Sequence, residues 1–104
     1  MLDISHIHFH DTQIWRVVED AESDTLTMEV NYPVDWQNNT FEPRMLVFEN
    51  AYNYQVHEMP FVGPPTILDV EITGTTGKWS HVRLETNAGW RSVSCVALAV
   101  RAGE

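Results

Sequence analysis

The strongest constraint on the fold is a repeated alternation of apolar and polar side chains. In residues 25–32, TLTMEVNY, every second side chain from Leu26 to Tyr32 is apolar or aromatic, and the residues between them are polar. This period of two is typical of a β-strand with one face buried and the other in water. It recurs in residues 66–73, TILDVEIT, whereas no stretch of ten residues has a clear helical period. The alternation therefore predicts an all-β chain.

Turn signals divide the chain at short intervals. DAESD (20–24) and NAG (87–89) predict hairpin loops, and GTTGK (74–78) predicts a further turn. About seven to eight short strands separated by such turns are typical of an antiparallel β-sandwich or a partly open barrel without a long helix. We expect residues 1–104 to form a single domain of this kind.

Several finer expectations follow from the same patterns. Residues 33–44 are bracketed by prolines and predict an irregular connection. Residues 44–58 predict one strand with a bend at its Asn-rich centre, and residues 90–100 predict one strand near the middle of a sheet. Across the last hairpin, Glu85 is expected to lie opposite Arg91.

Composition and charge restrict the classes of partner. A chain of 104 residues with 43% hydrophobic residues can bury a core, and its single cysteine, Cys95, excludes an internal disulfide and fits a reducing compartment. The start of the chain lacks a signal peptide pattern and no apolar run could span a bilayer, so we expect a cytoplasmic protein. The net charge of −9 disfavours nucleic acid and membranes and favours a basic protein or a cation, although solubility alone would also explain it.

Three of the five histidines lie at every second position near the start, in SHIHFHD. On an extended segment His6, His8 and His10 share one face, while Ile7 and Phe9 share the other. Neighbouring histidines would be about 6.6–7 Å apart along the strand and could bind one metal ion, but the outer pair would be about 13 Å apart.

Two interpretations of this motif stay open. A metal site would use two adjacent histidines and a further ligand such as Asp11, His57, His81 or Cys95. The simpler interpretation, which we favour, is an edge strand whose histidines face the solvent while Ile7 and Phe9 enter the core. No cofactor other than such a metal ion is expected.

Evidence for catalysis is weak. Cys95 lies in the most apolar stretch, where a thiol is usually buried and inert. The segment GTTGKWS lacks the spacing of a phosphate-binding loop, and no serine lies in a strand–turn–helix elbow. The sequence thus favours a protein that is not an enzyme.

Aromatic residues in loops are the remaining candidates for binding. Trp36 and Phe41 lie in a polar loop, and Phe61 lies in the proline-rich segment MPFVGPPT. Such residues can anchor a protein or a sugar, or they can fold back over an open end of a small sandwich.

The order of features resembles a loosely defined group of bacterial proteins. The chain carries FHDTQIWRV, TLTMEV, VFENAYNY and ETNAGW in that order, and this order is similar to that of small all-β bacterial proteins of unassigned function, some of which are immunity partners of toxins. The resemblance spans most of the chain but provides no catalytic residues. It implies a binding role.

Together these observations predict a non-enzymatic interaction domain that binds a protein partner or itself. A basic toxin is the most specific version of the partner, since an acidic surface steers association with such a target. Self-association through a sheet edge, with the N-terminal strand as a candidate edge, is also expected. The alternative is a protein that binds a metal ion or small ligand through the N-terminal histidines.

Overall fold

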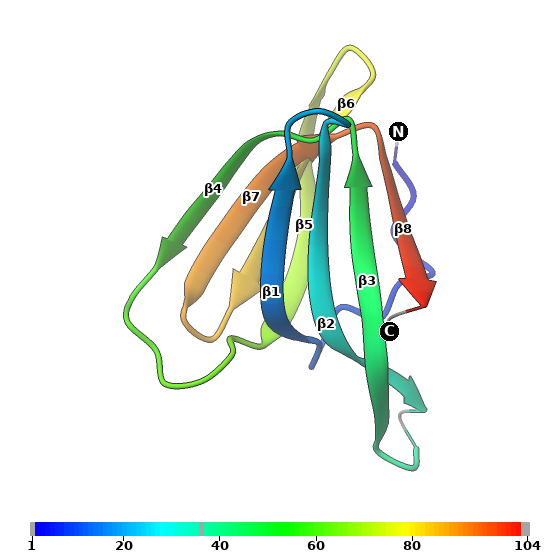
Figure 1. Ribbon diagram of the computed structural model, residues 1–104, viewed down its shortest axis with the longest axis vertical. Coiled ribbons are helices and arrows are strands. Elements are labelled where there is room, and N and C mark those ends of the chain that lie inside the picture. Colours follow the sequence, from blue (N-terminus) through cyan, green and yellow to red (C-terminus); the bar gives the residue numbers. More distant parts are fainter. Residues whose placement is uncertain (1, 36, 103–104) are drawn as a thin grey trace.

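The structure is a computed structural model that describes residues 2–35 and 37–102 (Figure 1). It contains eight strands: β1 (Gln13–Asp20), β2 (Thr25–Asp35), β3 (Thr40–Glu49), β4 (Tyr52–Glu58), β5 (Ile67–Thr76), β6 (Trp79–Thr86), β7 (Gly89–Cys95) and β8 (Ala97–Ala102). No helix occurs among the described residues, so none there could cross a membrane.

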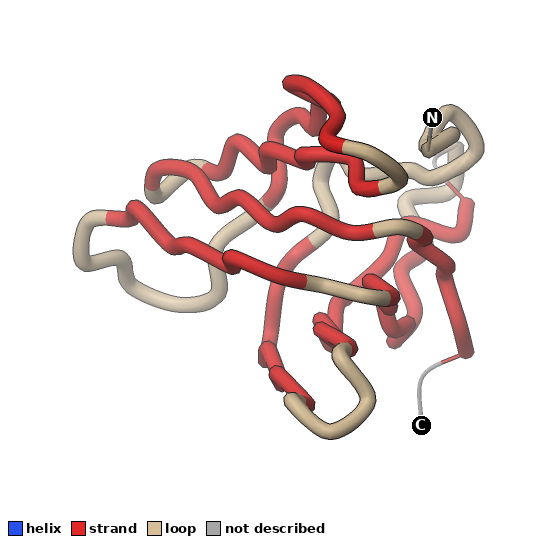
Figure 2. Tube along the Cα trace, turned by 90° about the horizontal axis from the view of Figure 1, so that it is seen from above, coloured by secondary structure: helices blue, strands red, loops and turns tan. Residues whose placement is uncertain are grey.

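The strands form two antiparallel sheets of four, which pack as two layers (Figure 2). Sheet A has the order β1-β2-β3-β8 and sheet B the order β4-β7-β6-β5. The predicted all-β sandwich is confirmed, and the sheets do not close into a barrel. Because neighbouring strands are antiparallel, the connections gather at two opposite ends of the molecule (Figure 1).

The core lies between the two sheets and follows the predicted alternation. On β2, Leu26, Met28 and Val30 are fully buried, and the residues between them face outward. The other sheet contributes the alternate residues of β6 and β7, which include Val82, Leu84, Val93 and Cys95. Side chains at every second position thus meet across the sandwich, as expected for packed sheets.

The expectation of an irregular connection at residues 33–44 is wrong. β2 continues to Asp35 and β3 begins at Thr40, so that Pro33 pairs with Phe41 and Asn31 pairs with Pro43. Both prolines lie beyond the last pairs that β2 makes with β1 and β3 makes with β8. The hairpin is two-stranded there, and a proline without an N–H is tolerated at such an edge.

Two strands that the sequence predicts as continuous are each divided between the sheets. The chain leaves sheet A after β3 and enters sheet B as β4, with Asn50 at a φ of 51° between them. The run 90–100 likewise splits at Val96 into β7, which is central in sheet B, and β8, which is an edge of sheet A. Residues 50–51 and the single residue Val96 are the links that carry the chain from one sheet to the other, without a long loop.

The N-terminal segment is not a strand. Residues 2–12 contain two turns. At the first turn Asp3 Oδ1 accepts a hydrogen bond from Ser5 N, and at the second turn Asp11 adopts a φ of 70°. Its predicted division of side chains is nevertheless confirmed: Ile7 and Phe9 are buried, whereas His6, His8 and His10 are exposed. Local side-chain hydrogen bonds have replaced strand pairing here.

The last hairpin is one residue out of the expected register. Thr86 pairs with Gly89, which leaves a two-residue turn at Asn87 and Ala88. Glu85 therefore lies opposite Trp90, and the expected pair of Glu85 with Arg91 is wrong. A shift of one residue moves Arg91 from the outer face to the inner face of the sheet.

Candidate functional site

The segment 59–66, which connects β4 to β5, is the longest connection among the described residues between strands, and it is tied down at both ends. At its start, Met59 N donates a hydrogen bond of 2.9 Å to the carbonyl of Ala88. At its end, Thr66 N donates to Asn87 Oδ1 (3.0 Å), and the carbonyl of Thr66 accepts from Asn87 N (3.1 Å). The turn between β6 and β7 therefore holds both ends of the segment.

A further contact joins this segment to the other sheet. Ile14 N on β1 donates a 2.9 Å hydrogen bond to the carbonyl of Pro65, and Gln13 forms a bridge with Thr66. Pro60, Pro64 and Pro65 restrict the backbone further, because the proline ring fixes φ. The segment is thus a constrained loop and not a loose linker.

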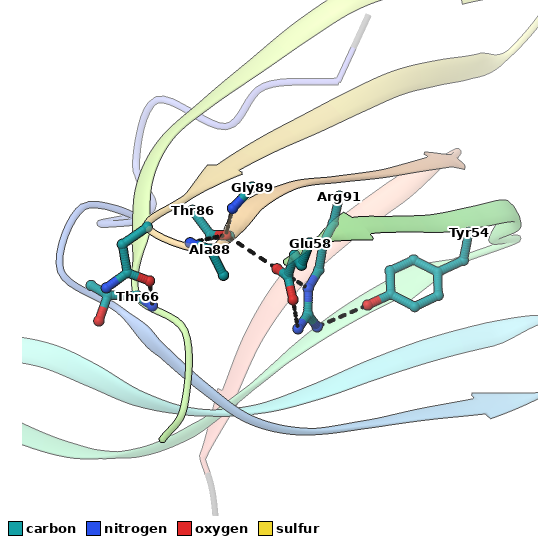
Figure 3. Close-up of polar contacts among 8 residues, drawn as sticks. Tyr54, Glu58, Thr66, Thr86, Ala88, Gly89 and Arg91 are labelled. Atoms are coloured by element: carbon teal, nitrogen blue, oxygen red, sulfur yellow. Dashed lines mark hydrogen bonds and ion pairs between the residues drawn. The ribbon is translucent and has the colours of Figure 1, made fainter. Parts of the chain in front are cut away.

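Below the start of the loop lies a buried ion pair (Figure 3). Arg91 binds Glu58 with two hydrogen bonds, Nε to Oε2 at 2.7 Å and Nη2 to Oε1 at 2.8 Å. The two side chains are only 11% and 12% exposed. Such a bidentate pair fixes the orientation of both groups.

Two further side chains complete this polar cluster, as Figure 3 shows. Arg91 Nη1 donates to the hydroxyl of Tyr54 (3.0 Å), and Thr86 Oγ1 donates to Glu58 Oε2 (3.1 Å). The Thr86 oxygen also accepts from the backbone N–H groups of Ala88 and Gly89. Glu58 is the last residue of β4, so the cluster locks the point where the loop begins.

The electrostatics of this cluster are those of a structural pair. The hydrogen bond from Arg91 is the main cause that lowers the pKa of Glu58, against the opposing effect of burial. Burial is the main cause that raises the pKa of Tyr54. At neutral pH the carboxylate is therefore charged and fully engaged and the phenol is neutral, so neither is available as a catalytic base.

The loop exposes three large apolar side chains. Met59 is 76% exposed, Phe61 is 46% exposed and Val62 is 99% exposed. Gly63 follows with a φ of 85°, a left-handed conformation that glycine adopts without strain. These three side chains are therefore exposed on a loop whose two ends are held by hydrogen bonds.

A shallow groove of about 350 Å³ lies beside the loop. Trp15 of β1, which is 49% exposed, lines one side, and Pro64 and Pro65 line the other. Arg91 also lines this groove. We call Met59, Phe61 and Val62, the three exposed apolar residues of the loop, the apolar loop surface.

The three aromatic residues predicted from the sequence as binding residues have different positions. Phe61 belongs to the apolar loop surface. Phe41 lies on β3, is half-buried and lines a separate hollow of about 110 Å³ with Pro33 and Asn39. Trp36 lies outside the described residues.

The predicted metal ligands lie at the opposite side of sheet B, near β5. His10 Nδ1 donates to the carbonyl of Leu68 (2.8 Å), and its Nε2 lies 3.6 Å from Asp11 Oδ1. His8 and His10, but not His6, line a groove of about 450 Å³ with Asp69. Across residues 2–35 and 37–102, no three His, Cys, Asp or Glu side chains come together in a way that could hold a metal ion.

Trp90 on the outer face of sheet B is already occupied by neighbours. Its ring stacks on that of His57 at 4.0 Å between centroids, and the Arg83 guanidinium lies 4.3 Å from the ring centre. Arg83 Nε in turn donates to Glu85 Oε1 at 2.7 Å. This aromatic ring is therefore not an open platform for a ligand.

The sequence analysis missed the Glu58–Arg91 pair and two of the exposed loop residues. Alternation along β7 places Arg91 in the same series as Val93 and Cys95, and that series is the buried one. A charge in such a series needs a buried partner, and this signal was present in the sequence. The partner itself lies 33 residues away on another strand, and no local pattern indicates it.

Comparison with known proteins adds no family to this description. No model of a known protein family matches the chain, and no curated protein is similar to it in sequence.

Proposed function

We propose that the chain is a non-enzymatic protein-interaction module whose apolar loop surface contacts the partner. The observation that carries this proposal is the exposure of Met59, Phe61 and Val62 on a loop tied at both ends. Burying apolar side chains supplies the main favourable free energy of association. A loop that is already ordered loses little conformational entropy on binding, which leaves more of that free energy as affinity.

The charge distribution supports a basic partner. Four carboxylates, those of Glu19, Asp20, Glu22 and Asp24, lie in and beside the turn between β1 and β2, at the end of the sandwich opposite the loop. The net charge of −9 would accelerate the approach of a basic protein, whereas these four carboxylates would not contact a partner seated on the loop. An immunity-type partnership with a basic toxin, as the sequence resemblance implies, is the most specific form of this proposal. We place it in the cytoplasm, in keeping with the buried, unpaired Cys95.

A binding experiment with single-site variants tests this proposal. The purified protein is titrated calorimetrically with a basic nuclease-type toxin from the same source, at low and at high salt. We expect Val62→Ser and Phe61→Ser each to weaken binding by about tenfold or more, as truncations at the centre of an interface do. Val18→Ser removes an exposed valine of β1 outside the loop and is the matched control.

High salt is expected to weaken binding of the wild type and of the loop variants alike and so to leave the difference between them in place, because charge attraction and apolar contact are separate contributions. Absence of binding to every basic toxin tried, or equal affinity of the loop variants and the wild type, would refute the proposed role of the loop.

The groove beside the histidines supports a second candidate function, the binding of a small ligand, whereas its metal form would need a further ligand, because no three described side chains come together as metal ligands. It has a volume of about 450 Å³, and it combines two imidazoles and a carboxylate, from His8, His10 and Asp69, with apolar walls. Metal analysis of the purified protein, repeated with His8 and His10 both changed to alanine, tests it. Stoichiometric metal that disappears in the variant would support this function, and its absence in the wild type would exclude the metal form.

A further inference from the structure

Sheet edges expose unpaired backbone N–H and C=O groups, and three of the four edge strands here are interrupted. The pairing of β1 shifts at Trp15, and that of β4 shifts between Tyr52 and Gln55. The pairing of β5 shifts twice, and Ile67 at its start also bonds to the N-terminal segment. Bulges of this kind, and chain segments that lie over an edge, are the usual features that prevent an edge strand from pairing with a strand of another molecule.

The fourth edge strand, β8, lacks this protection. It pairs with β3 without a shift from Ala97 to Ala102, and its sequence, ALAVRA, contains one charged residue, Arg101, and no proline. It forms the margin of sheet A opposite β1 (Figure 1). No backbone hydrogen bond from the rest of the described chain reaches its outer side.

We propose that a second copy of this chain pairs with β8 across a two-fold axis, antiparallel, with Ala99 opposite Ala99 of the other copy. The two A sheets would then form one continuous sheet of eight strands. This surface is separate from the apolar loop surface, so the proposal does not depend on the proposed partner. Isologous pairing of this type is the commonest form of protein dimer.

The charges at the two ends of β8 select this register. Ala97, Ala99 and Arg101 alternate with the buried Leu98, so they lie on the outer face, and Glu49 lies beside Ala97 on that face. Pairing about Ala99 places Arg101 opposite Ala97 of the other copy. Glu49 of that other copy lies on the next strand, β3, beside the same Ala97. The small alanine leaves space for the long arginine side chain to reach that carboxylate.

Arg101 and Glu49 have no ion-pair partner among the described residues, 2–35 and 37–102. Each of the other four arginines forms an ion pair with a glutamate. A register centred on Val100 instead would place Arg101 opposite Ala99, beside the apolar Val47. Only pairing about Ala99 gives two opposite-charge contacts related by the two-fold axis, and opposite charges on neighbouring strands stabilise a sheet.

Sedimentation equilibrium over a concentration series reaching about 1 mM tests the proposal, with mass measured for wild type and variants. We expect a monomer–dimer equilibrium in the wild type. Ala99→Lys places two lysines face to face at the axis and should weaken the dimer by about tenfold or more, because like charges directly opposite are destabilising. Val18→Lys, on the outer face of the other edge of sheet A, is the matched control and should leave the dimer unchanged.

A charge exchange tests the register itself. Arg101→Glu and Glu49→Arg should each weaken the dimer, and the double variant should restore it to within about threefold of the wild type. A wild type that stays monomeric throughout the series overturns the proposal. So does a dimer that Ala99→Lys leaves intact, and a dimer that the double exchange fails to restore overturns the proposed register.

Discussion

Arg91 lies on the inner face of β7, in a series of side chains that otherwise contains Val93 and Cys95. A guanidinium in this position is tolerated because Glu58 and Tyr54 accept its hydrogen bonds. The pair also fixes the last residue of β4, from which the apolar loop begins. The same contacts thus link the stability of the sandwich to the geometry of its proposed binding surface.

At this residue scale, we predict that Arg91→Leu destabilises the protein by about 3 kcal/mol, because it leaves the buried carboxylate of Glu58 without an opposite charge and with only the hydrogen bond from Thr86. The double variant with Glu58→Leu should recover a large part of this loss, since no unpaired charge remains. Chemical denaturation of wild type, both single variants and the double variant measures these differences. A single variant as stable as the wild type would show that the pair does not constrain the fold.

The same pair predicts a pH dependence. Because the folded-state pKa of Glu58 is below its ordinary value of 4.5, the stabilisation is fully present above about pH 4.5 and is lost as the pH falls through the folded-state pKa. Glu58→Gln removes this titrating group, so its stability should fall less steeply than that of the wild type below pH 4.5. Denaturation curves at a series of acidic pH values compare the two slopes, and parallel slopes would contradict the assignment.

At the scale of the elements, Gly89 determines how closely β4 and β7 approach. A side chain there would fall on the carbonyl oxygen of His57 and lie 2.9 Å from Glu58 Cα. Gly77, in the turn between β5 and β6, also has a positive φ, but the space around it is open. Gly89 itself has a φ of 152°, so a substitution there adds a steric collision to the backbone strain that both positions share.

We predict that Gly77→Ala costs about 1 kcal/mol, the strain of a left-handed residue. Gly89→Ala should cost more than about 2 kcal/mol, because the strands must separate to admit the methyl group. Thermal or chemical unfolding of the two variants measures the difference. Equal costs would mean that the approach of β4 to β7 is not tight.

Most of the elements could be predicted from the sequence, but their division between sheets could not. The alternation in residues 25–32 and the turns at 20–24 and 74–78 depend on local side chains, which the sequence displays directly. The layer changes at Asn50 and Val96 depend on which strands pair at long range, and neither glycine nor proline indicates them.

The same distinction applies to the candidate site. Phe61 was recognisable as an aromatic residue in a proline-rich loop, and the burial of Ile7 and Phe9 followed from their spacing. The exposure of Met59 and Val62 depends on how Asn87, Ala88 and Pro65 hold the loop, and these contacts join three separate elements. Register errors of one residue, as at Glu85, reverse the face of every side chain that follows.

At the scale of the whole molecule, the proposed functions occupy separate regions of one rigid sandwich. The apolar loop surface lies at one end, the acidic turn between β1 and β2 lies at the other, and β8 forms one margin of sheet A. This separation allows the chain to pair with a second copy and still present the loop to a partner.

Backbone amide hydrogen exchange, measured with and without a saturating basic toxin partner, tests the central claim most directly. Prolines have no amide, so Met59, Phe61, Val62 and Gly63 report on the loop. We predict that the partner slows exchange at these four amides, whereas raising the protein concentration alone slows exchange along β8. Unchanged exchange at residues 59–63 in a saturated complex would contradict the assignment of the apolar loop surface as the site of binding.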